Sequence, residues 1–147
     1  MESNKHTGAA AELAVARELA KEGFTVSFPH GDDAKFDLVS SIDGVTKRIQ
    51  VKTAAIREDY GTYKVAFTHG TAKKEPYSPE DCECICVWLP YADDFKNEVV
   101  SGFYIIPTED AQVYNGTFYP PGTHKQGSDK VCDFEKFRNN LEFLKKR

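Results

Sequence analysis

FDLVSSIDGVTKRIQVKT, residues 36–53, is the stretch that decides the fold. Two runs rich in Val, Leu and Ile flank the pair Asp43-Gly44, a strong signal for a two-residue hairpin turn. Side chains alternate between the two faces of a strand, so Gln50 and Lys52 share one face of the second strand. The stretch therefore predicts a β-hairpin whose second strand has one apolar and one polar face.

Three polar side chains gather at the open end of this hairpin. Asp37 lies in the first strand, although Asp is disfavoured in strand interiors. Gln50 and Lys52 lie on the second strand. Burying an acid, an amide and an amine on a core element is unfavourable unless they serve a purpose. We therefore interpret the group as a site, and hard oxygen ligands beside an amine favour metal-dependent phosphodiester hydrolysis.

The composition is that of an ordinary globular domain. The chain has 147 residues, of which 40% are hydrophobic and 29% are charged, so we predict a single domain over residues 1–147. No apolar run approaches the roughly 18 residues of a membrane span, and the opening MESNKHTG has no hydrophobic segment of a signal peptide. We expect a cytoplasmic protein with no membrane partner.

The charge pattern is neutral to slightly unfavourable for nucleic-acid binding. A net charge of -4 argues mildly against binding through bulk positive charge. Basic residues nevertheless crowd the hairpin, and a polar loop at residues 69–79 holds a further pair that would suit a nucleic-acid backbone. The candidate contacts are Lys47, Arg48, Arg57, Lys73 and Lys74.

Helices are expected at both ends of the chain. Thr7 is placed to cap a helix over residues 8–22, and Gly23 is suited to end it. A closing helix is predicted from about Asp133. The apolar stripe of the first helix is Leu13, Val15, Ala16, Leu19 and Ala20, and that of the last is Phe134, Phe137, Leu141 and Leu144.

The middle of the chain predicts strands. Apolar alternation and short apolar runs indicate strands at residues 24–28, 61–67, 83–89 and 102–106. Thr108 is placed to cap a short helix. Residues 115–130, rich in Gly, Pro and Thr, predict an extended loop.

The cysteines and the loop histidine have simple structural explanations. Cys82, Cys84 and Cys86 alternate on a predicted strand and should share one face. The Cys-x-Cys spacing suits zinc poorly, so we expect small buried hydrophobes with free thiols. A cysteine-based metal or redox protein ranks last among the possible functions. His30 is most simply a solvated loop residue.

Glu12 lies on the same helical face as Val15, Ala16 and Leu19. A Glu at the edge of an apolar stripe is often a solvated side chain near the start of a helix, where its charge suits the dipole. Alternatively, a helix packed across the hairpin would bring Glu12 to Asp37. The helical pattern alone leaves both interpretations open.

If these side chains converge, each has a chemical role. Mg²⁺ takes oxygen ligands and keeps several waters. Lys52 would hold the attacking water or stabilise the charge that develops at phosphorus. The expected ligands are Asp37 directly, the amide oxygen of Gln50, the backbone carbonyl of Val51, and Glu12 through water.

Several stretches, taken in order, resemble the PD-(D/E)xK nuclease superfamily. They are TGAAAELAVARELAKEGFTVS (residues 7–27), GDDAKFDLV (31–39) and RIQVKT (48–53). The spacing from Asp37 to Gln50-Val51-Lys52 is similar to the superfamily signature, with a preceding helix that carries a Glu. PYSPEDCECICVWLP, GFYIIP and FRNNLEFL extend the likeness to group I intron-type homing endonucleases, and archaeal Holliday junction resolvases are the other similar branch.

The resemblance implies an α/β fold with a restriction-endonuclease-like core, in which helices flank a central mixed sheet. It also implies cleavage of DNA with Mg²⁺, for which Mn²⁺ would substitute, and assembly as a homodimer or higher oligomer. The implied active-site set is Glu12, Asp37, Gln50 and Lys52. Phe36 stands where the signature has Pro, and Gln50 removes one negative charge.

Two classes of function remain in competition. The leading hypothesis is a metal-dependent DNA endonuclease, either resolvase-like or homing-endonuclease-like. The alternative is a catalytically weak or inactive nuclease-fold module that binds nucleic acid or protein. The isoelectric point near 5.6 and the amide at Gln50 support the alternative.

Overall fold

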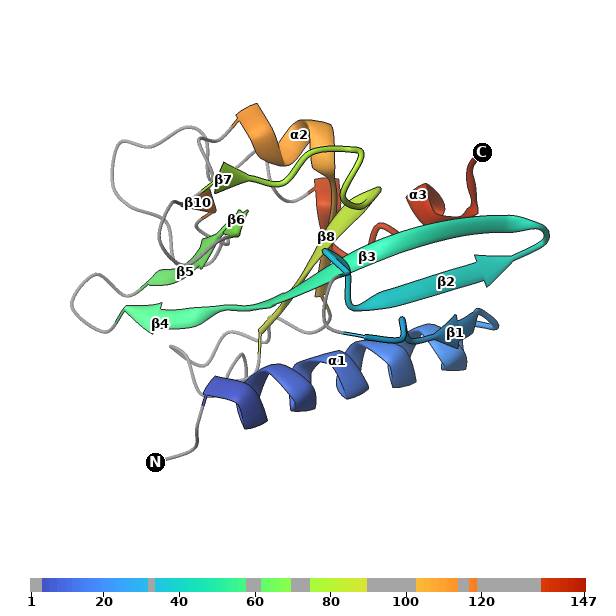
Figure 1. Ribbon diagram of the computed structural model, residues 1–147, viewed down its shortest axis with the longest axis horizontal. Coiled ribbons are helices and arrows are strands. Elements are labelled where there is room, and N and C mark those ends of the chain that lie inside the picture. Colours follow the sequence, from blue (N-terminus) through green and yellow to red (C-terminus); the bar gives the residue numbers. More distant parts are fainter. Residues whose placement is uncertain are drawn as a thin grey trace.

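β3 (Val45–Thr53) is the strand on which the central sheet is assembled (Figure 1). The computed structural model describes residues 4–31, 34–57, 62–69, 75–89, 103–113, 117–118 and 136–147. β3 pairs antiparallel with β2 (Leu38–Ile42) on one side and parallel with β8 (Cys84–Trp88) on the other. β1 (Thr25–Ser27) and β9 (Phe103–Pro107) add antiparallel edges, giving the order β1-β2-β3-β8-β9. The predicted mixed sheet is confirmed.

The predicted hairpin is confirmed at its turn. Asp43 and Gly44 have φ angles of 48° and 79°. Two successive left-handed residues are the requirement of a type I′ turn, whose twist matches the flanking strands. The first pair of the ladder, Ile42 with Val45, follows directly.

Helices and small sheets cover the two faces of the central sheet. α1 (Asn4–Lys21) and α3 (Leu141–Lys145) pack on one face, and α2 (Thr108–Val113) packs on the other. The first core cluster includes Ala11, Val15, Leu19, Leu38, Ile49, Val51, Cys84, Cys86 and Leu144. The second includes Ala54, Val65, Phe67, Tyr77, Cys82, Ile85, Val87, Tyr104 and Ile106.

The connection from β3 to β8 holds most of the strands that the sequence did not predict. β4 (Ala55–Arg57) and β10 (Thr117–Phe118) flank β5 (Thr62–Ala66) in one small sheet. β6 (Thr68–His69) and β7 (Glu75–Pro76) form another. These strands have two to five residues each, too short for a periodic pattern to stand out. Of them, only β5 was predicted.

α1 differs from its prediction at its start and agrees at its end. It begins at Asn4, so Thr7 lies inside the helix and is not its N-cap. Gly23 has a φ of 92°, and the N–H groups of Gly23 and Phe24 donate to the carbonyls of Ala20 and Leu19. This is a Schellman C-cap. Among the described residues, no helix is both long and apolar enough to cross a bilayer.

The predicted apolar stripe of α1 was partly wrong. Leu13 is 63% exposed, and the small Ala11 is buried in its place. A helix that crosses the sheet buries positions 11, 15 and 19, which repeat every four residues. Leu13 points away from this line.

The closing helix begins later than predicted. Asn139 has a left-handed φ of 49°, and its side-chain oxygen accepts a hydrogen bond from the N–H of Phe103. This turn breaks the helical run, so α3 starts only at Leu141. Phe137 and Leu144 are buried as expected, but on opposite core clusters. Asp133 and Phe134 lie outside the described residues, as does most of the predicted loop at 115–130.

The cysteines are buried free thiols, as predicted, but they do not share one face. Cys84 and Cys86 face α1 and α3, whereas Cys82 packs in the opposite cluster. The reason is that β8 begins at Cys84, so strand alternation does not extend back to Cys82. Burial raises the pKa of Cys84 and Cys86. Inert core thiols are the result.

Candidate active site

The base of the hairpin is where β2 ends and β3 continues. The last ladder pair joins Leu38 to Ile49, and the N–H of Asp37 donates to the Ile49 carbonyl at 2.8 Å. Beyond this point β3 has no partner from β2. The N–H of Val51 instead donates to Oδ2 of Asp37 at 2.9 Å. The carboxylate thus takes the place of a missing strand residue, which explains an Asp at the edge of a buried strand.

α1 brings a second carboxyl group to Asp37. Glu12 is half-buried and lies close to Asp37, on the same cleft. Burial, followed by the negative charge of the nearby Asp37, raises the pKa of Glu12 from 4.5 to about 7. Of the two interpretations of Glu12, the structure therefore supports the one in which it faces the hairpin.

A cleft opens beside the two carboxyl groups. Its volume is about 340 Å³. The segment between β1 and β2 supplies one wall, and α1 supplies Glu12. The lining residues are Glu12, Phe28, Pro29, Gly31, Ala34, Phe36 and Asp37. The acidic pair is therefore reachable by a ligand from solvent.

The next residues of β3 alternate as predicted. Ile49 and Val51 are 1% and 7% exposed under α1. Gln50 lies on the other face, and its Nε2 donates to the carbonyl of Val51 at 3.3 Å. A carbonyl oxygen has two lone pairs, so this contact leaves one for another partner.

The side chain of Lys52 extends to Thr68 and Tyr77, neither of which was itself predicted as a site residue. Its Nζ donates to the carbonyl of Thr68 at 3.3 Å and lies 5.1 Å from the centroid of the Tyr77 ring. Burial, and then the charge of Asp37, raises the pKa of Tyr77. Tyr77 is thus within electrostatic range of the Asp37 carboxylate. The one sequence signal for it was a Tyr inside an otherwise polar loop.

Of the predicted site residues, Glu12 and Asp37 line the cleft, whereas Gln50, Val51 and Lys52 are not among its lining residues. Among the described residues, no three His, Cys, Asp or Glu side chains form a metal-binding group. Two neighbouring carboxyl groups, of which Glu12 has a raised pKa, are suited to exchange a proton for a divalent cation. The all-oxygen chemistry fits Mg²⁺ or Mn²⁺ and not a thiolate metal.

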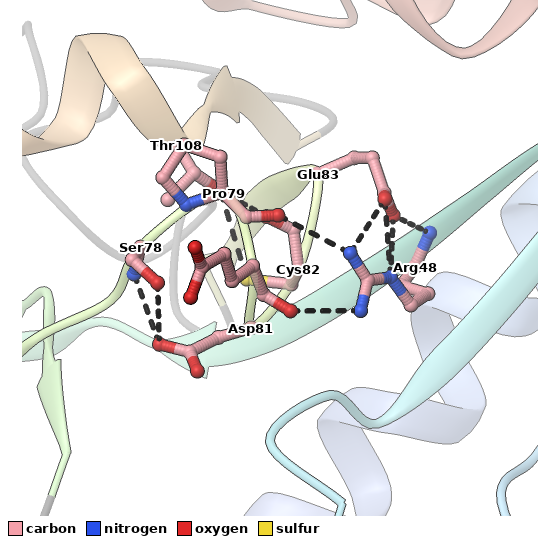
Figure 2. A network of polar contacts seen from close by, with 8 residues as sticks. Arg48, Ser78, Pro79, Asp81, Cys82, Glu83 and Thr108 are labelled. Atoms are coloured by element: carbon pink, nitrogen blue, oxygen red, sulfur yellow. Dashed lines mark hydrogen bonds and ion pairs between the residues drawn. The ribbon is translucent and has the colours of Figure 1, made fainter.

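Arg48, a predicted DNA contact, is committed to an internal network (Figure 2). Its Nη2 lies 2.7 Å from Oε1 of Glu83, and its Nε and backbone N–H also donate to that carboxylate. Its Nη1 and Nη2 donate to the carbonyls of Glu80 and Pro79. These contacts join β3 to the segment before β8. They do not favour the predicted contact with nucleic acid.

Of the other predicted DNA contacts, the structure gives a side-chain contact only for Lys47. Lys47 Nζ lies 4.6 Å from the ring centroid of Phe143 in α3. The Arg57 side chain, Lys73 and Lys74 lie outside what the structure describes. The loop residue His30 is exposed and is not among the residues that line the cleft.

Comparison with known proteins gives three results. A family model described as PD-(D/E)XK endonuclease matches residues 2–138. Protein 5.3 of Escherichia phage T7 is 37% identical over 82 residues, which are 55% of this chain and 69% of that protein. The solved structure of the bacterial homing endonuclease I-Ssp6803I superposes with a TM-score of 0.80 at 22% identity, covering 97% of this chain and 93% of that one. The last result is a likeness of fold.

Proposed function

The chain belongs to the PD-(D/E)XK endonuclease family, and from that premise we propose that it is a metal-dependent endonuclease that hydrolyses phosphodiester bonds in DNA. The family resemblance seen in the sequence is confirmed. The observation that carries the proposal is the pairing of Glu12 with Asp37 beside an open cleft, with the Asp37 carboxylate fixed on the N–H of Val51.

The residues divide the work as follows. Asp37 is held by its hydrogen bond from the N–H of Val51 and would be the direct anionic ligand of a bound cation. Glu12 accepts a proton or orients the attacking water, because its raised pKa of about 7 suits proton exchange near neutral pH. Lys52 donates to that water or to the phosphate oxygens as negative charge develops.

A divalent cation would be held by Asp37, the amide oxygen of Gln50, the carbonyl of Val51 and Glu12. When bound, it would neutralise phosphate charge and lower the pKa of a coordinated water. Mg²⁺ is the proposed ion, with Mn²⁺ as a substitute. Gln50 supplies a neutral oxygen where a carboxylate would add charge, so we expect weaker metal binding than at a site with three acids.

The neutral amide at Gln50 also supports a second candidate function. With two carboxylates in the described part of the site, the protein would bind DNA or another protein through a nuclease fold without cutting. Titration calorimetry with Mg²⁺ or Mn²⁺ separates the two candidates. No binding in the parent protein favours the second one.

We propose that the protein acts as a homodimer or higher oligomer. Both strands of a duplex, or opposite strands of a four-way junction, are cut symmetrically by two sites that a two-fold axis relates. Light scattering of the purified protein tests this, and a monomeric mass with and without DNA would contradict it.

The test of function uses three substrates in Mg²⁺: supercoiled plasmid, linear duplex and a four-way junction. We expect the parent protein to cleave at least one of them and Asp37→Asn and Lys52→Ala to cleave none at a comparable rate. Matched controls are Asp43→Asn at the hairpin turn and Lys21→Ala at the exposed end of α1, which should cleave like the parent.

The substrate pattern identifies the branch. Cleavage of the junction alone indicates a resolvase-like enzyme, and cleavage of duplex at defined positions indicates a homing-endonuclease-like enzyme. Equal rates for parent, Asp37→Asn and Lys52→Ala would contradict the proposed site.

A further inference from the structure

We propose that Tyr77 is a positioning residue for Lys52, and that the β6–β7 hairpin fixes the lysine ammonium at the active site. This inference rests on the proposed function. It concerns a part of the molecule outside the signature residues, between β5 and β8.

The β6–β7 hairpin contacts the end of the lysine at two points. Lys52 Nζ lies 5.1 Å from the Tyr77 ring centroid, inside the range of a cation–π interaction. The same atom donates to the Thr68 carbonyl at 3.3 Å. Thr68 is in β6, and Tyr77 directly follows β7. The two contacts therefore restrain a long side chain at its charged end.

Tyr77 is itself held firmly. It is 5% exposed and belongs to the core cluster on the α2 side of the sheet. Its N–H donates to the carbonyl of Phe67, and its carbonyl accepts from Nε2 of Gln112 in α2. The ring therefore cannot swing away from Lys52 without disturbing the core.

His69 packs against the Tyr77 ring, and Asp81 lies beside His69. The His69 and Tyr77 ring centroids are 4.9 Å apart, and Nε2 of His69 lies 3.7 Å from Oδ2 of Asp81. Burial alone would raise the pKa of Asp81, but the N–H of Ser78 and the charge of Lys35 outweigh it and lower that pKa. An ionised Asp81 thus fixes the turn that follows Tyr77.

β3 anchors this arrangement at a second position. Arg48 and Lys52 lie four residues apart on the same face of β3, and Arg48 holds the carbonyls of Pro79 and Glu80 (Figure 2). The segment that carries Tyr77 is therefore tied to the strand that carries Lys52. A preorganised ammonium needs little rearrangement as charge develops on the substrate.

The test compares Tyr77→Phe with Tyr77→Leu in single-turnover and steady-state cleavage. Phe keeps the ring, so its kcat should stay within about twofold of the parent. Leu removes the ring, and kcat should fall about tenfold while KM for DNA stays within about twofold. Tyr104→Leu is the matched control, because it makes the same change in the same core cluster on β9.

An NMR measurement reads the contact without catalysis. The ε-methylene protons of Lys52 should show an upfield ring-current shift in the parent and in Tyr77→Phe. The shift should disappear in Tyr77→Leu and persist in Tyr104→Leu. This readout keeps its meaning even if Tyr77→Leu is less stable.

The outcomes are distinguishable. Equal loss of kcat in Tyr77→Leu and Tyr104→Leu, or no ring-current shift in the parent, overturns the positioning role. Equal loss in Tyr77→Phe and Tyr77→Leu overturns it in favour of the hydroxyl. A parent that cleaves no DNA overturns the proposed function and with it the catalytic purpose of the contact, whereas cleavage unchanged in Tyr77→Leu overturns the positioning role alone.

Discussion

The two ends of the β2–β3 hairpin use the same pair of strands for opposite purposes. At the turn, Asp43 and Gly44 close the ladder, and Ser41 Oγ lies 3.0 Å from Thr46 Oγ1 across it. At the base, β2 stops and a carboxylate replaces its next residue, beside a second carboxylate from α1. Near the turn, the backbone N–H and C=O groups bond to backbone groups of the partner strand. At the base, the N–H of Val51 bonds to the side chain of Asp37.

The difference teaches where a sheet can hold a reactive group. A regular ladder leaves no backbone donor for a side chain to satisfy. A strand that outruns its neighbour leaves such donors, and an acid that accepts from one becomes fixed in position. We expect changes at the base to affect chemistry and changes at the turn to affect stability.

The largest expected effect is at Asp37. Asp37→Asn keeps an oxygen that can accept from the N–H of Val51, so the free energy of unfolding should change little. Cleavage should fall by about a hundredfold or more, because the variant lacks the anionic ligand that we propose for the metal ion. Asp37→Ala should lose cleavage and also about 1–3 kcal/mol of stability, since it leaves the N–H of Val51 unsatisfied. Denaturant unfolding and cleavage rates measure both effects, and equal stability of the Asn and Ala variants would contradict the explanation.

Arg48 lies between the two ends of the hairpin. Replacing it tests whether the middle of β3 contributes to stability and not to DNA binding. Arg48→Ala removes the charge-assisted hydrogen bonds to Glu83 and should lower stability by about 1–2 kcal/mol. The Kd for DNA should stay within about twofold, because the guanidinium is occupied internally. A large rise in Kd with unchanged stability would restore Arg48 as a DNA contact.

At the turn, Gly44→Ala should affect stability alone. Its Cβ would lie 3.5 Å from Nη2 of Arg147, an ordinary contact, but the φ of 79° disfavours a residue with a side chain. The expected loss is about 1 kcal/mol, with no change in cleavage rate. A loss of cleavage in a folded variant would show that the two ends are coupled.

The smallest expected effect is a pH dependence at Glu12 in metal-free protein. Its pKa is raised from 4.5 to about 7 in the folded state, so the folded protein keeps this proton to higher pH than the unfolded chain. The stabilisation is complete below pH 4.5 and is lost as pH rises through 7. Because Glu12 is partly exposed, the change should be less than about 1 kcal/mol.

Glu12→Gln should remove that decline. Unfolding in EDTA at several pH values measures it in both proteins. An identical pH dependence of parent and variant would show that Glu12 does not titrate in this way.

The hairpin was predictable because its signals are local, whereas the approach of Glu12 to Asp37 was one of two interpretations that the helical pattern left open. The Asp-Gly turn, the alternation along β3 and the helical face of Glu12 each extend over a few residues. Gly23 was predictable for the same reason. These features depend on backbone geometry that the nearest residues determine.

The rest depends on contacts between distant segments. The partner of Arg48 is Glu83, 35 residues away, and no residue near Arg48 in the sequence predicts this pair. Tyr77 follows two strands of two residues each, and its own burial comes from the core cluster on the α2 side of the sheet. The break before α3 depends on Asn139 reaching the N–H of Phe103. No periodic pattern in the sequence reports such pairings.

The parallel pairing of β3 with β8 has a consequence for the order of folding. The hairpin can form from neighbouring residues, but β8 can join β3 only after residues 54–83 have closed a long loop. Long-range parallel pairing is slow compared with hairpin formation. Asp37 should therefore reach its position early in folding. The segment that contacts the Lys52 side chain through Thr68 and Tyr77 should dock late. Under the proposed function, a newly synthesised chain would be able to cut DNA only when the whole sheet has assembled.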